Sequence, residues 1–245
     1  AGDTIVPNTR GTNPSNVSVN KDAGFSIVSW VSSGGTTSSN YIGHGLDETP
    51  EAILIKDRDS TENWHFYTNM VDNSHDYFFL DTTAAKANSG YTAPTSDYFY
   101  WASNEDNHYI AYCWHSVPGY SKIGKYVGTG SGDRGFVYTG FKPAWVMVKH
   151  ATGSVGTGYT SWLIVDSKRS SVNPVGITTN LWANYNAAEG VRGDGTSAPS
   201  GVGALDFLAN GFRMRDTNSD EVNDPSDTYI YMAFAEAPFT RTSAK

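Results

Sequence analysis

The feature that most constrains this chain of 245 residues is an internal repeat, in which the same landmarks occur twice and in the same order. Residues 119–123 echo residues 24–27 after about 95 positions, and residues 143–149 echo residues 50–56. A repeat of this length is far longer than the units of solenoids and propellers, and it has the size of a small β-sandwich. We therefore expect two diverged copies of one sandwich-sized unit, with a boundary near residues 117–119.

Each copy consists of short segments in which apolar and polar residues alternate with a period of two. This alternation, interrupted by turn-forming residues, is typical of the half-buried strands of sandwiches and barrels. In the first copy the pattern predicts strands at residues 24–30, 52–55, 64–67, 77–80, 98–101 and 109–114, and a weak helical window at 82–88. The predicted fold class is all-β: two tandem antiparallel β-sandwich units, of jelly-roll or lectin-like type, related by the internal repeat.

The repeat divides the chain into three segments. Residues 1–22 are rich in Asn, Thr, Ser and Gly, which predicts an extended polar N-terminal arm or linker. Residues 23–117 form the first predicted sandwich, and residues 118–245 form the second. The landmarks of the second copy are spaced more widely, so we expect a loop insertion there, at residues 191–203.

Composition and charge exclude several classes of protein. The formal net charge of −8 disfavours binding to the phosphates of nucleic acid, and no basic patch offsets it. The sequence contains no run that approaches the roughly 20 apolar residues of a membrane span. The single cysteine, Cys113, lies in an apolar run and is expected to be a buried small hydrophobic residue. Without a disulfide, stability must come from the core and from association, so we expect a homo-oligomer.

Several longer runs of sequence resemble one known family. These runs are residues 23–28, 42–46, 93–96, 110–113, 136–144, 206–212 and 229–236. Together they resemble the C-terminal domain of tail-fibre-like and other virion structural proteins of tailed phages, especially marine ones. The biochemical function of that family is unknown. The resemblance implies a β-rich fold, a place on the virion surface and other virion subunits as partners, and by analogy with neighbouring lectin-type domains it suggests glycan or receptor binding.

Aromatic residues supply the candidate binding site. Sugar faces stack on exposed aromatic rings, and flanking polar groups bond the hydroxyls. Trp101 and Trp182 have no clear partner in the other copy, so they are candidates for exposed binding residues, together with Tyr98 and Tyr185. Packing in the core, or against a partner subunit, is the alternative explanation for the same residues.

The sequence offers one weak metal site and no cofactor motif. Asp216, Asn218, Asp220 and Asp227 have the oxygen-ligand spacing of a calcium loop. The glycine that such a loop needs at its sixth position is replaced by Glu221, and no helices flank it. An acidic hairpin loop is therefore the alternative, and we expect no cofactor.

These observations favour a phage virion structural protein, a tail-fibre or receptor-binding module that binds a surface such as a host glycan without catalysis. One alternative is a self-assembling fibre or capsid-decorating subunit, in which the N-terminal arm adds a strand to a neighbour. A second alternative is a glycan hydrolase. Its candidate carboxylates would be Asp57, Asp59, Asp166 and Asp216.

Overall fold

The computed structural model describes residues 4–32, 40–103, 106–152, 160–169, 172–174, 179–191, 205–215 and 221–238. Within these residues every regular element is a β-strand, and every pair of strands is antiparallel. The all-β prediction is therefore confirmed. The helical prediction for residues 82–88 is wrong, because this segment is irregular and ends in a short strand. No helix in the described part of the chain could cross a membrane.

The chain forms two compact units. The first consists of Ala1–Phe79 and Ala87–Val117, and the second of Leu80–Lys86 and Pro118–Lys245. Apart from the short segment Leu80–Lys86, the two units meet in the sequence between Val117 and Pro118.

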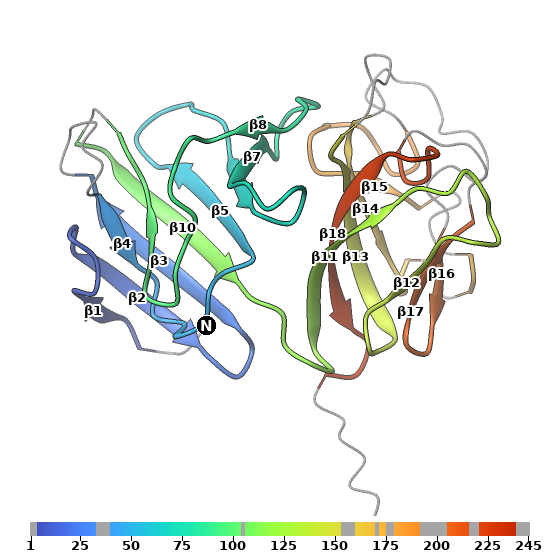
Figure 1. Ribbon diagram of the computed structural model, residues 1–245, viewed down its shortest axis with the longest axis horizontal. Coiled ribbons are helices and arrows are strands. Elements are labelled where there is room, and N and C mark those ends of the chain that lie inside the picture. Colours follow the sequence, from blue (N-terminus) through green and yellow to red (C-terminus); the bar gives the residue numbers. More distant parts are fainter. Residues whose placement is uncertain are drawn as a thin grey trace, which may run out of the picture. The chain divides into compact units, whose positions relative to one another are not determined.

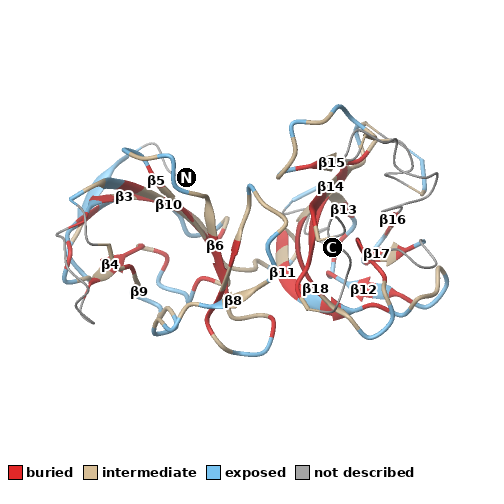
Figure 2. Cartoon of the chain, turned by 90° about the horizontal axis from the view of Figure 1, so that it is seen from above, coloured by how far each residue is buried: buried red, intermediate tan, exposed pale blue. Residues whose placement is uncertain are grey.

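The first unit is a sandwich-like pair of layers (Figures 1 and 2). Its strands are β1 (Val6–Asn8), β2 (Ser15–Asn20), β3 (Phe25–Val31), β4 (Tyr41–Gly43), β5 (Ala52–Asp57), β6 (His65–Thr68), β7 (Asp76–Phe79), β8 (Ala87–Asn88), β9 (Tyr98–Tyr100) and β10 (His108–Trp114). The large sheet has the strand order β1-β2-β3-β10-β5-β6-β7-β8, and β4 and β9 form a small sheet. The small sheet faces β3, β10 and β5 across the buried interior (Figure 2).

The core of the first unit lies between these two sheets. Trp30 of β3 stacks on Tyr109 of β10 with ring centroids 5.4 Å apart, and its ring meets the Phe99 ring of the small sheet edge-on at 5.6 Å. Cys113 is a free, fully buried cysteine in this core, as expected from its apolar run, and burial raises the pKa of its thiol to about 12.

The predicted N-terminal arm is part of the large sheet. Residues 15–20 form β2, which pairs with β3 along its length, and β1 pairs with β2. Val17 is 1% exposed and lies in the core, while the hydroxyl of Ser15 donates to the carbonyl of Gly43 at 2.8 Å. Within the predicted arm or linker, residues 6–8 and 15–20 are therefore strands of the first unit. The segment is rich in polar residues because side chains alternate along the strand, so that only every second one contacts the core.

The second unit repeats the two-layer plan. Its strands are β11 (Ser121–Val127), β12 (Phe136–Tyr138), β13 (Pro143–His150), β14 (Trp162–Asp166), β15 (Leu181–Trp182), β16 (Leu205–Leu208), β17 (Gly211–Met214) and β18 (Thr228–Ala235). The large sheet has the order β11-β18-β13-β14-β15, and the small sheet has the order β12-β17-β16. Val148, Leu163, Phe212 and Tyr229 are among the buried side chains that fill the core of this unit.

The strand orders of the two units correspond. The series β3-β10-β5-β6-β7 in the first large sheet has the same chain order as β11-β18-β13-β14-β15 in the second. In the small sheets, β4 pairs with β9 and β12 pairs with β17. This agreement of order is what a duplication would produce, although the internal repeat itself stays a prediction.

The buried side chain of His44 stabilises the turn that follows β4 through two hydrogen bonds. The backbone N–H of Leu46 donates to Nδ1 of His44 at 3.2 Å, so the ring proton is on Nε2 and is donated to the carbonyl of Thr95 at 3.1 Å. The His44 side chain is fully buried, and burial lowers its pKa to about 4. The neutral ring therefore ties residues 44–46 to the segment that leads into β9.

The integration of β2 is testable with two neighbouring substitutions. Val17→Ala should destabilise the first unit by roughly 1–3 kcal/mol, because it removes buried methyl groups and leaves a cavity. Asn16→Ala is the matched control, because Asn16 lies on the exposed side of the same strand, and it should change the stability by less than about 0.5 kcal/mol. Urea denaturation followed by tryptophan fluorescence measures both. Equal, small effects would contradict the placement of β2 in the core.

The buried histidine predicts a pH dependence of stability. Because the pKa of His44 is about 4 in the folded chain and about 6.5 when unfolded, the unfolded state takes up a proton first as the pH falls. Above pH 6.5 His44 therefore has no effect on the pH dependence of stability. As the pH falls from 6.5 towards 4, its protonation in the unfolded state lowers the free energy of unfolding by about 3 kcal/mol. In urea denaturation at pH 7 and pH 4, His44→Gln should lose correspondingly less stability than the unsubstituted chain. An identical loss in both proteins would show that His44 is not the cause.

Candidate functional site

The structure places the two tryptophan candidates in the cores. The side chain of Trp101 is 7% exposed and that of Trp182 is 5% exposed. Trp101 contacts the rings of Tyr109 and His65 at 5.2 and 5.5 Å, and Trp182 belongs to the core of the second unit. Neither indole presents a face to solvent, so their proposed role as exposed binding residues is corrected to core packing.

The two tyrosine candidates lie nearer the surface. Tyr185 is half-buried against the core of the second unit, and its backbone N–H donates to the carbonyl of Trp182 at 3.3 Å. Tyr98 is half-buried on the outer face of the β4–β9 sheet in the first unit. Tyr98 and Trp101 thus belong to the first unit and Trp182 and Tyr185 to the second, and Tyr98 lies beside another half-buried ring, that of Tyr41.

The candidate calcium loop falls almost entirely outside the described residues. Asp216, Asn218 and Asp220 are not among the described residues. Asp227 is described, and its Oδ2 lies 2.9 Å from Nε2 of His150. Among the residues that the structure describes, no group of three or more His, Cys, Asp or Glu side chains could hold a metal ion.

A buried lysine in the second unit has a structural explanation. Burial lowers the pKa of Lys149 to about 7, and Nζ donates to the carbonyl of Thr160 in the following loop. Lys56 occupies the corresponding place in the first unit, where Nζ donates to the carbonyl of Ser60 at 2.9 Å. Both lysines tie the loop that follows their strand to the sheet, and this accounts for the buried amine.

The strongest candidate site is the outer face of the small sheet in the first unit. Side chains alternate across a strand, so the inward positions of Ile42 and Phe99 leave Tyr41, Tyr98 and Tyr100 pointing outward. The ring of Tyr41 lies 4.5 Å from that of Tyr98 and 6.0 Å from that of Tyr100. We call these three half-buried rings the tyrosine patch.

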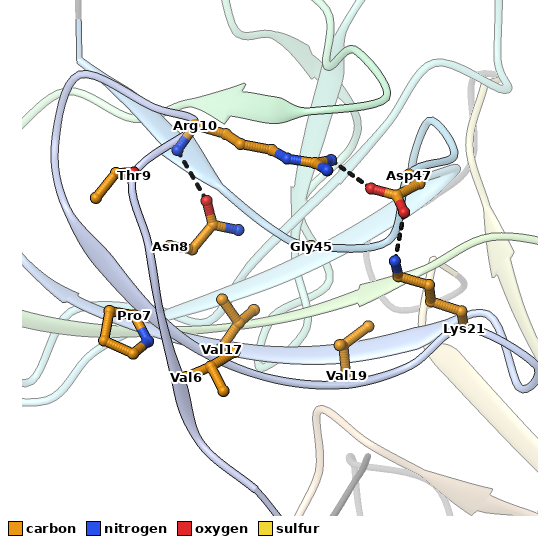
Figure 3. Close-up of a pocket in the computed structure, with 10 residues that line it drawn as sticks. All are labelled: Val6, Pro7, Asn8, Thr9, Arg10, Val17, Val19, Lys21, Gly45 and Asp47. Atoms are coloured by element: carbon orange, nitrogen blue, oxygen red, sulfur yellow. Dashed lines mark hydrogen bonds and ion pairs between the residues drawn. The ribbon is translucent and has the colours of Figure 1, made fainter.

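A groove borders the corner that follows β4 (Figure 3). It has a volume of about 340 Å³, within the range of small-molecule sites. It is lined by Val6, Pro7, Asn8, Thr9, Arg10, Val17, Val19, Lys21, Gly45 and Asp47. Val6 is exposed and Val19 is half-buried on the apolar side of the groove, where Val17 is buried in the core, and the charged residues form the rim (Figure 3).

Ion pairs arrange the rim of the groove. Arg10 contacts the carboxylate of Asp47 and, at 3.0 Å, that of Asp97, while Lys21 contacts Asp47 from the other side (Figure 3 draws both contacts to Asp47). The backbone N–H of Arg10 donates to Oδ1 of Asn8 at 2.9 Å. Since Asp97 directly precedes Tyr98, Arg10 links the groove to the tyrosine patch.

The electrostatics of the rim fix the protonation state of its carboxylate. Hydrogen bonds from Lys21, and then from Arg10, hold the pKa of Asp47 below its usual value. The same pairing raises the pKa of Arg10. Asp47 is thus an ionised acceptor between two cationic donors. This alternation of donors and acceptors next to the apolar side of the groove suits a ligand with several hydroxyl groups.

The sequence contained a signal for the patch but not for the groove. In Tyr41–Gly43 and Tyr98–Tyr100, a single apolar residue that faces inward requires its neighbours to face outward. The groove depends on residues 6–21 lying beside Gly45 and Asp47, and the prediction of a polar arm or linker gave no indication of this.

The comparisons with known proteins identify a family. The searches of curated proteins and of solved structures found no match. A family model described as "Domain of unknown function (DUF7483)" matches residues 1–238. This match covers nearly the whole chain and agrees with the expected domain of unknown function. The chain therefore belongs to the DUF7483 family.

Proposed function

We propose that this protein is a binding module that recognises glycans through the tyrosine patch and the adjoining groove, without catalysing a reaction on them. The observation that carries the proposal is the position of three accessible tyrosine rings beside a rim of paired charges. The C–H-rich face of a sugar ring packs on an aromatic ring, and tyrosine offers this surface at little cost in side-chain entropy. Asp47 would accept hydrogen bonds from hydroxyl groups, to which Lys21 and Arg10 would donate.

The carboxylates favour binding over glycoside hydrolysis. A glycosidase of the usual type needs a general acid with a raised pKa, whereas the pKa of Asp47 is lowered. Asp57 accepts hydrogen bonds from the backbone of Asp59 and the side chain of Asn107, at 2.9 and 2.8 Å. Asp166 accepts the backbone N–H groups of two following residues, at 2.9 Å each. These two carboxylates therefore hold turns together.

We also propose where the protein acts and with which partners. The resemblance to tail-fibre-like domains supports a place on a virion surface, in a homo-oligomer with other virion subunits as neighbours and a host-surface glycan as the receptor. We do not propose assembly through a free N-terminal arm, because residues 15–20 already pair with β3 of the same chain.

We also propose that the two units arose by duplication. The two units share their strand order, and they also share the structure of the turn that follows β4 in the first unit and β12 in the second. Gly45 and Gly140 have φ values of 76° and 85°, in the left-handed region that favours glycine. The N–H groups of Leu46 and Phe141 donate to the side chains of His44 and Thr139, at 3.2 and 3.4 Å.

Substitutions in the patch test the proposed function. A glycan array should identify a ligand of the full chain, whose affinity is then measured by titration calorimetry. Tyr98→Ala should lower the affinity for this ligand about tenfold, because it removes a stacking surface. Lys21→Gln should lower the affinity several-fold, because it removes a charged donor. Tyr112→Ala is the matched control, because Tyr112 is half-buried on the outer face of the large sheet. Loss of affinity in the control alone would place the site elsewhere and contradict the proposal.

A further inference from the structure

We propose that the second unit carries its own binding face, on the outer side of the β12–β17–β16 sheet, and that it takes a glycan bearing a carboxylate or sulfate group. The choice of a glycan rests on the proposed function. The location and the preference for an acidic group rest on different residues, Phe136, Tyr138 and Arg213, which we call the second patch.

Two exposed aromatic rings mark this face. Val137 and Phe212 point inward and are 6% and 0% exposed, so the neighbouring positions on β12 point outward. Phe136 is 44% exposed and Tyr138 is 66% exposed. Tyr138 is thus far more accessible than the tryptophans that the sequence suggested.

A glycine keeps the second patch open. Gly211 pairs directly with Tyr138, and a Cβ built on Gly211 would lie 2.1 Å from the carbonyl oxygen of Val137 and 3.0 Å from the ring of Phe136. Any side chain there would force the strands apart and displace the Phe136 ring. In the first unit a glycine also pairs with a tyrosine, Gly43 with Tyr98, but there a Cβ would meet the side chain of Asn8.

The second patch includes a cation that a ligand could use. Arg213 pairs with Phe136 across the strands. On its other side Arg213 pairs with Asp206 of β16. The carboxylate of Asp206 lies 3.5 Å from Nε of Arg215, and Arg215 also forms an ion pair with Asp133 at 3.2 Å. Among the described residues no carboxylate forms an ion pair with Arg213. A guanidinium beside an aromatic ring binds carboxylate or sulfate oxygens in a bidentate manner.

A second groove begins at the corner next to Tyr138. It has a volume of about 290 Å³. Its lining includes Gly140, Lys142 and Glu236. Lys142 and Glu236 form an ion pair at 2.7 Å on its rim. Gly140 corresponds to Gly45, so both grooves include the glycine that follows the first strand of the small sheet.

The chemistry of the second patch favours a small acidic sugar over a macromolecule. A stable protein interface buries about 800 Å² on each side around an apolar centre. Two aromatic rings beside charged residues provide no such centre. Nucleic acid needs several cations that neutralise successive phosphates, whereas Arg213 is a single cation that suits one anionic group. A glycan with an anionic group uses both the rings and Arg213.

The test is titration calorimetry of the full chain with three probes: a sulfated galactan hexasaccharide, its desulfated counterpart and an oligogalacturonate. Tyr138→Ala should weaken binding of both acidic probes about tenfold. Arg213→Gln should weaken the binding of both acidic probes about tenfold, and added salt should also weaken their binding. Lys122→Gln, which removes one positive charge from β11 of the same unit, should leave the affinity unchanged.

The outcomes separate this inference from the proposed function. If Tyr138→Ala and Arg213→Gln leave the affinity for the acidic probes unchanged, the second patch is not a binding site, even where Tyr98→Ala weakens the ligand of the first unit. If they weaken the acidic probes while Tyr98→Ala has no effect on any glycan, the second patch stands and the tyrosine patch falls. If neither acidic probe binds the unsubstituted chain, the inference is overturned.

Discussion

Both candidate faces depend on one constraint, the filling of each core by the inward side chains of a short, separate sheet. Ile42 and Phe99 in the first unit, and Val137 and Phe212 in the second, are at most 6% exposed. Because side chains alternate along a strand, burial of these residues commits their neighbours to the outer face. A shift of one residue would place polar tyrosine hydroxyls and Arg213 inside and the apolar residues outside. The outer faces are therefore held in register by the stability of the cores.

The sequence was sufficient for the elements whose pattern is local. Short alternating segments such as Phe25–Val31 and His108–Trp114 were recognisable as strands because their period of two is sustained. Trp101 is buried although it has no clear partner in the other copy, so the lack of a repeat partner does not indicate exposure. It follows the buried Phe99 by two positions, so alternation alone places both side chains inward. The groove could not be predicted, because the ion pairs of Arg10 join residues that lie 37 and 87 positions apart.

The two units combine one architecture with different outer surfaces. The first presents three tyrosines beside a rim in which Arg10 and Lys21 are both paired with Asp47. The second presents Phe136 and Tyr138 beside Arg213. Different chemistry on corresponding faces is what duplication followed by divergence would give. Two sites on one chain would raise the avidity for a polymeric glycan without any increase in the affinity of a single site.

The central claim is that the outer faces of the small sheets, and not the outer faces of the large sheets, contact the ligand. Its most direct test is a backbone-amide NMR titration of the isotope-labelled chain with galactan oligosaccharides in neutral and sulfated forms. The account predicts that shift changes concentrate in β4, β9 and residues 8–10 and 45–47 of the first unit, and in β12 and β17 of the second. Changes concentrated instead around Phe25, Tyr112 and Trp114, which stack on one another on the large sheet of the first unit, would contradict it.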